Sequence, residues 1–325
     1  MLNMKNGYLK PVALLAATIL CIFSLQAQTG KATTSPVQVN PQALNFILMG
    51  DWGRVGADHQ KEVATQMGKT AETADVDFVI TTGDNFYPEG VVSEFDPLWR
   101  YSFEEIYTAF SLQRDWHPVL GNHDYGSNPD AQVAYSKISR RWRMPARYYT
   151  EVFNLGGDTT QQALFVFIDT TPLIKSYYKG KGHKVHDQDS TAQLKWIEQT
   201  LAKTSPNVKW KFVVGHHPMY TGGGRTEGND TRAIRGMLEP IFEKYKVDAF
   251  LAGHEHSLQH MVATNGLNHF ISGAASEHTP ARMLPISKFS KSEYGFMLVS
   301  LTREKFLVQV IDYKGAVLYT TQLVK

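Results

Sequence analysis

Five short runs of the sequence share one pattern, in which an apolar stretch ends at a glycine followed by side chains that can bind metals. The runs are Gly50-Asp51-Trp52-Gly53, Gly83-Asp84-Asn85-Phe86-Tyr87, Gly121-Asn122-His123-Asp124, Gly215-His216-His217-Pro218 and Gly253-His254-Glu255-His256. Aspartate, asparagine, tyrosine and histidine offer the oxygen and nitrogen atoms that suit iron, zinc or manganese. The sequence therefore predicts a metal site built from five loops.

The stretch before each run has the length and apolar character of a β-strand. These stretches are residues 44–49, 78–82, 117–120, 211–214 and 249–252. In an open α/β sheet, ligands gather at the carboxyl ends of the strands, where a glycine permits a sharp exit turn and close approach of the backbone. Five such loops can therefore meet at one point.

The number of donor side chains indicates two metal ions rather than one. Seven donors that share one carboxylate make two sites of four ligands each, and two metals roughly 3.5 to 4 Å apart are the standard clamp for displacement at phosphorus. A single Asn-His or Gly-Asp pair is weak, because it usually marks a turn. The Gly-His-Glu-His run is stronger, since imidazoles at positions i and i+2 point the same way and can straddle two metals.

The rest of the chain predicts an α/β protein with two sheets that share one core and helices outside. A further strand is expected at 164–168, and helical spacing joins Val63, Met67 and Ala71 as well as Leu194, Ile197 and Leu201. After residue 256 the pattern changes to strands only, at 258–263, 269–272, 296–301, 306–311 and 317–323.

The charge balance argues against non-specific binding of nucleic acid. The 325 residues include 33 Lys and Arg against 31 Asp and Glu, and two of the basic residues, Lys5 and Lys10, lie in a segment without acidic residues. Without that segment the balance is 31 against 31, whereas a nucleic-acid-binding face needs an excess of basic side chains.

The N-terminus has the pattern of a secretory signal peptide. Lys5 and Lys10 precede an apolar run at 12–25, and the small residue Ala27 predicts cleavage after it. A retained membrane anchor is the alternative, but the run is shorter than the roughly 20 residues that span a bilayer. We expect a signal peptide at 1–27, a linker at 28–43, one domain at 44–325, and a periplasmic or secreted protein without a membrane segment after cleavage.

Cysteine chemistry is absent from this predicted mature chain. Cys21 is the single cysteine of the sequence and lies within the predicted signal peptide. Neither a disulfide, nor a thiolate ligand, nor a cysteine nucleophile is then available. Any metal must be bound through nitrogen and oxygen atoms.

From residue 44 to the C-terminus, the five runs resemble the purple acid phosphatases, within the dinuclear metallophosphoesterases, and specifically the small tartrate-resistant type. Many other metallophosphoesterases carry Asp-x-His in the first run, where this chain has Gly53, and Tyr87 supplies a donor instead. The resemblance implies a four-layer α-β-β-α sandwich of two mixed sheets. A phenolate is a hard anionic donor that favours a trivalent ion, so Fe(III) is expected beside Tyr87.

The resemblance also implies a role for each donor. Fe(III) is held by Asp51, Tyr87 and His256, Asp84 bridges the two ions, and a divalent Fe, Zn or Mn is held by Asn122, His216 and His254. A metal-bound hydroxide then attacks the phosphorus of a phosphate monoester. His123 faces the phosphate and can protonate the leaving group, so His123 and Asp84 are the expected catalytic residues. Small phosphorylated molecules are the expected substrates, and we expect a monomer.

The chain departs from the family pattern after the fourth run. Residues 219–226 contain no histidine where related enzymes have one, but they offer Arg225 after three glycines. Arg225 can bind phosphate in a bidentate manner or lie solvated on a flexible loop. His217, where tyrosine is common, is a second candidate for substrate binding, and the loop at 176–189 either contacts substrate or is a solvated loop.

Two other functions remain open from the sequence. The same dinuclear site could serve a phosphodiesterase or nucleotide pyrophosphatase, although Tyr87 and the missing first-run histidine follow the acid phosphatase pattern. A non-catalytic iron-binding protein is a third possibility, and it leaves His123 without a role.

Overall fold

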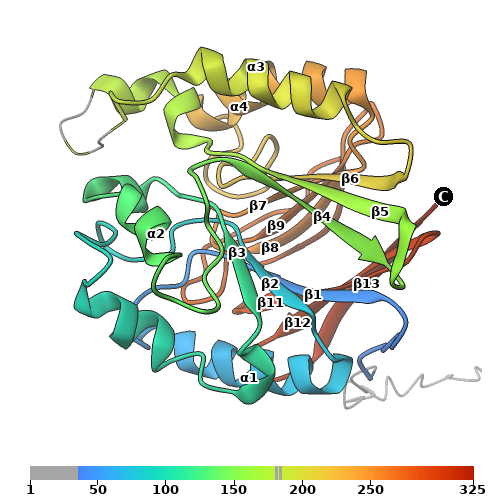
Figure 1. Ribbon diagram of the computed structural model, residues 1–325, viewed down its shortest axis with the longest axis horizontal. Coiled ribbons are helices and arrows are strands. Elements are labelled where there is room, and N and C mark those ends of the chain that lie inside the picture. The colour runs from blue at the N-terminus through green and yellow to red at the C-terminus, as the bar shows by residue number, and fades with distance from the viewer. Residues whose placement is uncertain (1–35, 180–181, 183–184) are drawn as a thin grey trace, which may run out of the picture. The chain divides into compact units, whose positions relative to one another are not determined.

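The apolar runs of the sequence pair into two mixed β-sheets that pack face to face (Figure 1). The computed structural model describes residues 36–179, 182 and 185–325. The expected signal peptide and the first half of the expected linker, residues 28–35, lie outside the described residues. The first strand, β1 (Leu44–Met49), begins where the sequence places the start of the domain. Within the described ranges, none of the helices combines the length and apolar character needed to cross a membrane.

The first sheet has six strands in the order β13-β12-β11-β1-β2-β3. β1, β2 and β3 are parallel, whereas β11, β12 and β13 pair antiparallel with their neighbours. The bounds are β2 (Phe78–Thr81), β3 (Asp115–Pro118), β11 (Gly295–Leu301), β12 (Lys305–Asp312) and β13 (Val317–Val324). The C-terminal strands thus extend the sheet that the N-terminal strands begin.

The second sheet has seven strands in the order β10-β8-β9-β7-β6-β5-β4. Its central strands β9, β7, β6 and β5 are parallel. β4 at one edge, and β8 and β10 at the other end of the sheet, pair antiparallel with their neighbours. The bounds are β4 (Tyr149–Leu155), β5 (Asp158–Phe167), β6 (Val208–Val214), β7 (Ala249–Ala252), β8 (Leu258–Val262), β9 (Asn268–Ser272) and β10 (Ser287–Lys291).

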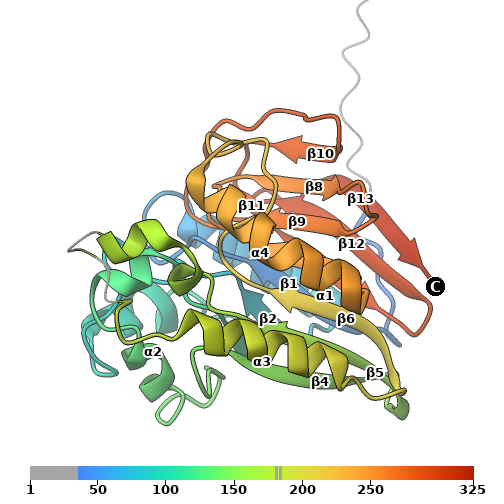
Figure 2. The same cartoon turned by 90° about the horizontal axis from the view of Figure 1, so that it is seen from above.

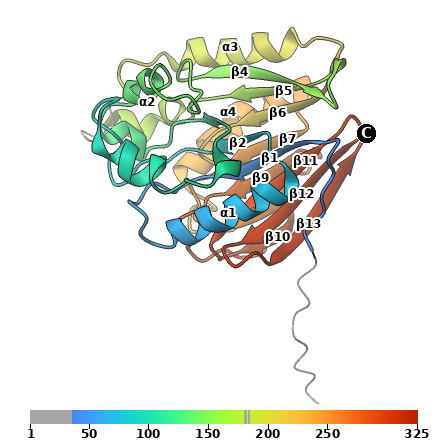
Figure 3. The same cartoon turned by 60° about the horizontal axis from the view of Figure 1, so that its bottom comes forward.

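Helices cover the outer faces of both sheets. α1 (Gln60–Ala74) lies against the first sheet (Figure 3), and α3 (Ser190–Ala202) and α4 (Asn229–Tyr245) lie over the second (Figure 2). α2 (Asp130–Tyr135) is a short helix near the strand ends. Shorter helical turns occur at Trp99–Glu104, Phe110–Leu112, His123–Gly126, Thr171–Leu173 and Lys175–Lys179.

Two apolar clusters hold these layers together. Between the sheets, the ring of Phe46 stacks on Phe78 at 5.0 Å and meets Phe165 of the other sheet edge-on at 5.5 Å. A second cluster joins the second sheet to α3 and α4, for example through Ile197 and Leu238. The predicted four-layer α-β-β-α sandwich is therefore confirmed.

The elements that the sequence did not predict are polar ones. β4 alternates exposed with buried residues at the edge of its sheet, β10 has the sequence Ser-Lys-Phe-Ser-Lys, and α4 carries Pro240 within a largely charged surface. None of these segments has a continuous apolar run. Pairing with a neighbouring strand defines β4 and β10, and burial of Ile234, Leu238 and Phe242 against the second sheet defines α4.

Buried histidines away from the strand ends remain neutral inside the core. His260 of β8 stacks on the ring of Phe270 at 4.2 Å, and its ring nitrogens lie 3.0 Å from the Tyr319 hydroxyl and 3.0 Å from the Asn268 carboxamide oxygen. Burial lowers the pKa of His260 from 6.5 to about 4. Protonation of this ring therefore favours the unfolded chain.

This burial predicts a pH dependence of stability. Between pH 6.5 and about 4 the unfolded chain binds a proton at His260 that the folded chain does not, so the free energy of unfolding falls as pH falls, by up to about 1.4 kcal/mol per pH unit. Urea unfolding of the metal-stripped protein across this range should show a shallower slope in His260→Phe. Met261→Leu, a neighbouring buried change without a titrating group, should keep the wild-type slope. Equal slopes in all three proteins would contradict the assignment.

Candidate metal centre

The five loops predicted to bind metal meet at one end of the two sheets. Asp51 and Asp84 follow β1 and β2, and Asn122 follows β3 of the same sheet, whereas His216 and His254 follow β6 and β7 of the second sheet. Parallel strands present their carboxyl ends at the same edge of a sheet. The packing of the two sheets then brings both sets of loops together.

One group of donors surrounds the hydroxyl of Tyr87. Its oxygen lies 3.3 Å from Oδ1 of Asp51 and 3.2 Å from Nε2 of His256, and the same Nε2 is 3.5 Å from Oδ1 of Asp51. Asp51 is fully buried and Tyr87 nearly so. A phenol, a carboxylate and an imidazole therefore face one small volume.

A second group of donors surrounds Nε2 of His216. This nitrogen lies 3.2 Å from Oδ1 of Asn122 and 3.1 Å from Nδ1 of His254. His216 and His254 come from adjacent strands of the second sheet, and Asn122 comes from the first. This group thus spans the junction between the sheets.

The carboxylate of Asp84 lies between the two groups. Its Oδ2 is 3.1 Å from the Tyr87 oxygen and 3.4 Å from Nε2 of His216, and its Oδ1 accepts a hydrogen bond of 2.8 Å from the backbone N–H of His123. Asp84 is almost fully buried. It is the donor placed within reach of both groups.

The distances between these donors fit two bound metal ions. Two ligand atoms at about 2.1 Å from one ion, separated by 90 to 110 degrees, lie roughly 3.0 to 3.4 Å apart. All but one of the separations in both groups, from 3.1 to 3.4 Å, fall in this range, and the remaining one, between His256 and Asp51, is 3.5 Å. The donor set is nitrogen and oxygen only, with two carboxylates and a phenol, which suits iron, zinc or manganese.

Neighbouring acceptors fix which ring nitrogen each histidine presents. Nδ1 of His216 donates to the carbonyl of Thr82 at 2.8 Å, so Nε2 faces the site. His254 is turned the other way, because its Nε2 lies 2.9 Å from Oδ2 of Asp230 and its Nδ1 faces His216. Such outer partners orient metal-binding imidazoles and make them better ligands.

Electrostatics in the metal-free chain favour a cation at this point. Burial, together with the charges of Asp84 and Asp51, raises the pKa of the Tyr87 phenol well above its usual value. Burial disfavours the charged form of His216, but the adjacent Asp84 carboxylate outweighs it and raises the pKa of His216 to about 9. Without a cation Tyr87 is thus a neutral phenol, and a metal ion is the charge that can hold it as phenolate.

Three of the donors have left-handed backbone conformations. The φ angles are 60° at Asp51, 47° at Asp84 and 69° at His254, a region that costs residues other than glycine about 1 to 2 kcal/mol each. Hydrogen bonds hold these turns in place, including one of 3.0 Å from the backbone N–H of His254 to Oδ2 of Asp51. Strain of this kind concentrates at functional sites.

The position of Gly53 explains the exchange of histidine for tyrosine. A Cβ atom at Gly53 would lie 2.0 Å from the backbone oxygen of Asn85. The carbonyl of Gly53 also accepts a hydrogen bond of 2.9 Å from the backbone N–H of Tyr87. The loop that carries Tyr87 thus lies directly against Gly53, and a histidine side chain at residue 53 would require that loop to move.

His123 lies at the rim of the site. Its Nδ1 donates to the carbonyl of Pro88 at 2.5 Å, and its Nε2 lies 4.0 Å from Oδ2 of Asp84. The ring packs against Tyr87 at 4.6 Å, and 40% of the side chain is exposed. His123 is therefore open to solvent beside the donors without being one of them.

His217 lies behind the donors rather than at the rim. It is fully buried, its Nδ1 is 2.8 Å from the Thr170 hydroxyl, and its Nε2 is 2.8 Å from the hydroxyl of Tyr177. Its ring packs on His254 at 4.3 Å, and burial lowers the pKa of His217 well below the usual value. Both ring nitrogens are engaged, so His217 joins the turn at Lys175–Lys179 to His216 and His254.

Arg225 lies at the rim on the side of His254. Its Nε is 3.7 Å from Oδ2 of Asp230, an Nη is 3.6 Å from Oε1 of Glu255, and its backbone N–H donates to the same Glu255 oxygen at 2.9 Å. About half of the side chain, 48%, is exposed. Arg225 thus combines an exposed guanidinium with carboxylate partners that hold it in place.

Several residues around the donors were not identified from the sequence. Asp230 supports His254, while Glu277 lies with Oε2 3.3 Å from Nδ1 of His256, and Arg54 lies with its guanidinium carbon 3.7 Å from the centre of the Tyr87 ring. Arg54 directly follows the first run, and this position was the one available signal. Asp230 and Glu277 belong to no run, and only the fold brings them near.

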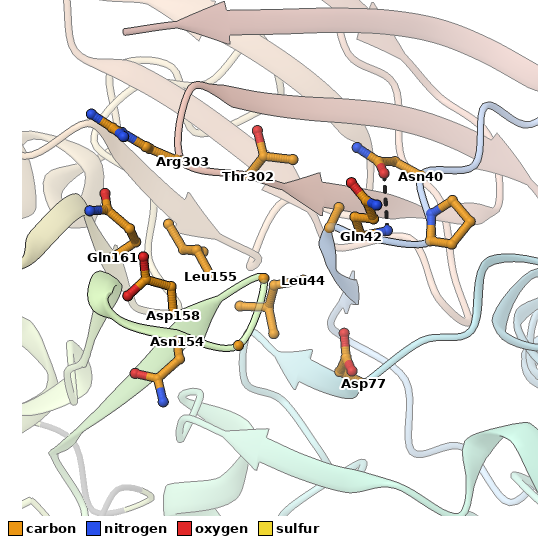
Figure 4. Close-up of a pocket in the computed structure, with 14 residues that line it drawn as sticks. Asn40, Gln42, Leu44, Asp77, Asn154, Leu155, Asp158, Gln161, Thr302 and Arg303 are labelled. Carbon is orange, nitrogen blue, oxygen red and sulfur yellow. Dashed lines mark hydrogen bonds between the residues drawn. The ribbon is translucent and has the colours of Figure 1, made fainter.

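A large pocket elsewhere in the chain is separate from these donors. It encloses about 770 Å³ and is lined by Asn40, Leu44, Asp77, Asn154 and Thr302, among others (Figure 4). Leu44 begins β1 and Asp77 precedes β2, so this pocket lies at the amino ends of strands whose carboxyl ends carry the donors.

Sequence comparison with known proteins points to the same family as the five runs. Residues 44–258 match the family described as calcineurin-like phosphoesterase. The chain is 36% identical over 292 residues to purple acid phosphatase 17 of Arabidopsis thaliana, covering 85% of this chain and 83% of that protein. It is 30% identical over 302 residues to human tartrate-resistant acid phosphatase type 5, covering 86% of this chain and 91% of that protein.

Solved structures agree on the fold. A purple acid phosphatase from yellow lupin seeds superimposes with a TM-score of 0.63 at 18% identity, covering 89% of this chain and 55% of that one. GAP50, described as the anchor in the inner membrane complex of Plasmodium, gives 0.75 at 24% identity and covers 87% and 89%. These likenesses establish the architecture, while the sequence relatives and the donor set identify the chain. It belongs to the calcineurin-like phosphoesterase family and, within it, to the purple acid phosphatases, which are phosphoric monoester hydrolases with a dinuclear metal centre.

Proposed function

We propose that this chain is an exported acid phosphatase that hydrolyses phosphate monoesters at a centre of Fe(III) and a divalent ion. The observation that carries the proposal is the Tyr87 hydroxyl, which lies within 3.3 Å of two buried carboxylates and 3.2 Å from His256. A phenol in such surroundings becomes a ligand only beside a strongly positive ion. Fe(III) meets that requirement better than a divalent ion.

The donor geometry supports one arrangement of the two ions. Fe(III) would be held by Asp51, Tyr87 and His256, and a divalent Fe, Zn or Mn by Asn122, His216 and His254, with Asp84 shared. When bound, the two ions supply positive charge to the phosphate oxygens and lower the pKa of water, so that hydroxide is available in mildly acidic solution.

His123 is the side chain best placed to act on the leaving group. Its Nδ1–H is held by the carbonyl of Pro88, so Nε2 is directed toward the opening above Asp84. An imidazole in this position can hold a phosphate oxygen or donate a proton to the departing alkoxide. Of the two other substrate-binding candidates, the exposed Arg225 is favoured over His217, whose ring is fully buried.

The location and the substrate class are part of the same proposal. The charged and apolar segments before Ala27 favour export to the periplasm or the medium. The balanced charge of the remaining chain favours small phosphorylated substrates over nucleic acid, and we propose that the enzyme acts as a monomer.

Replacing His123 tests the catalytic assignment. His123→Ala should lower kcat for phenyl phosphate by roughly 10²- to 10⁴-fold with unchanged metal content. The loss should be smaller with p-nitrophenyl phosphate, whose leaving group needs no proton. His278→Ala, at an exposed histidine whose Nδ1 lies 2.9 Å from the Ser292 hydroxyl, is the matched control. Full activity of His123→Ala would contradict the role, and faster turnover of bis(p-nitrophenyl) phosphate than of the monoester would favour a phosphodiesterase.

Metal analysis of two variants tests the sharing of Asp84. Asp84→Asn should lower the content from about two ions per chain to less than one, because both groups of donors lose the same carboxylate. Asp230→Asn, which alters the outer partner of His254 and the ion pair with Arg225 but no donor, should weaken binding of the divalent ion by about 10- to 100-fold and leave iron in place. Two ions per chain in Asp84→Asn would show that Asp84 does not bridge.

A further inference from the structure

Three side chains form a cluster beside Tyr87, and none of them is a metal donor. Arg54 comes from the loop after β1, and Ser276 and Glu277 come from the loop after β9. Nε of Arg54 donates to Oγ of Ser276 at 3.2 Å, and an Nη of Arg54 donates to Oε2 of Glu277 at 2.5 Å. The Arg54 side chain is 22% exposed, so most of its surface is covered by these partners and by Tyr87.

Each member of this cluster contacts a different donor of the proposed ferric site. The guanidinium carbon of Arg54 lies 3.7 Å from the centre of the Tyr87 ring. The hydroxyl of Ser276 donates to the backbone oxygen of Asp51 at 2.6 Å, and Oε2 of Glu277 lies 3.3 Å from Nδ1 of His256. Arg54 and its two partners therefore touch all three residues that would hold Fe(III).

The other half of the centre has a related but different arrangement. His254 is hydrogen-bonded to Asp230 at 2.9 Å, and Asp230 is paired with Arg225. His256 lies 3.3 Å from Glu277, without a hydrogen bond, and Glu277 is paired with Arg54. Arg225 has no aromatic metal donor beneath it, whereas Arg54 lies over the face of one. A guanidinium over the face of an aromatic donor is thus a feature of the donor group around Tyr87 and not of the group around His216.

We propose that Arg54 is a positioning residue that tunes the electron density of the Tyr87 phenolate and, through it, the ferric ion. This inference rests on the proposed Fe(III) at Tyr87. A guanidinium over an aromatic face attracts the π electrons, so it lowers the energy of the filled phenolate orbitals from which charge transfers to iron. Glu277 holds the guanidinium at that place and leaves Arg54 little freedom to turn toward a substrate phosphate.

The position of the charge-transfer band tests the role of Arg54. Arg54→Met keeps the bulk but removes the charge, and Arg54→Gln is a second variant. In the iron-loaded enzyme both should shift the visible band to longer wavelength and lower the reduction potential of the iron, because the phenolate becomes a stronger donor. Arg225→Met, the matched control, should leave the band unchanged. Iron content is measured in every protein.

Each other outcome overturns the inference in a distinguishable way. A wild-type band that is unshifted in both Arg54 variants would refute the tuning role while leaving the ferric site intact. A raised KM for phosphate monoesters without a spectral shift would make Arg54 a substrate-binding residue instead. Loss of iron from both variants would make it merely structural, and an iron-loaded wild type without any such band would refute the proposed ferric site itself.

Discussion

The buried carboxylate of Asp84 lies between two groups of donors. This position depends on how the two sheets pack and on how every loop of the site is held. Oδ2 of Asp84 lies 3.1 Å from the Tyr87 oxygen and 3.4 Å from Nε2 of His216, which come from different sheets. A carboxylate can be shared in this way only if the two sheets pack with their parallel strands ending at the same edge. The aromatic core between the sheets fixes that packing, so the apolar interior and the metal chemistry are parts of one arrangement.

Bringing so many polar groups together is unfavourable, because it strains the backbone and buries charge. Hydrogen bonds within the site offset both costs. The left-handed backbones at Asp51, Asp84 and His254 are held by hydrogen bonds among the same loops. The rings of His216 and His254 are oriented by oxygen acceptors behind them, a backbone carbonyl at His216 and a carboxylate at His254. A bound cation would stabilise this assembly further, because it meets carboxylates and a phenol that are withdrawn from water.

The sequence allowed the donor set to be predicted because each donor follows an apolar strand and a glycine, a signal that repeats along the chain. Less of the architecture could be predicted, because β4 and β10 are polar edge strands that form only by pairing with a neighbouring strand. The contacts behind the donors could be predicted least. Glu277 reaches His256 from the loop after β9, and Asp230 reaches His254 from the first turn of α4, both without a motif. His217, beside a donor in sequence, turns into the interior toward Thr170 and Tyr177. Contacts of this kind depend on three-dimensional packing, which local sequence does not encode.

The visible absorption spectrum of the purified, metal-analysed protein tests the central claim most directly. Tyrosinate bound to Fe(III) gives a charge-transfer band, whereas sites with two zinc or manganese ions do not. We predict a coloured protein with iron and one further metal ion per chain, and loss of the band in Tyr87→Phe. A colourless, fully active protein that holds two divalent ions would contradict the claim and would make Tyr87 a neighbour of the centre rather than a ligand.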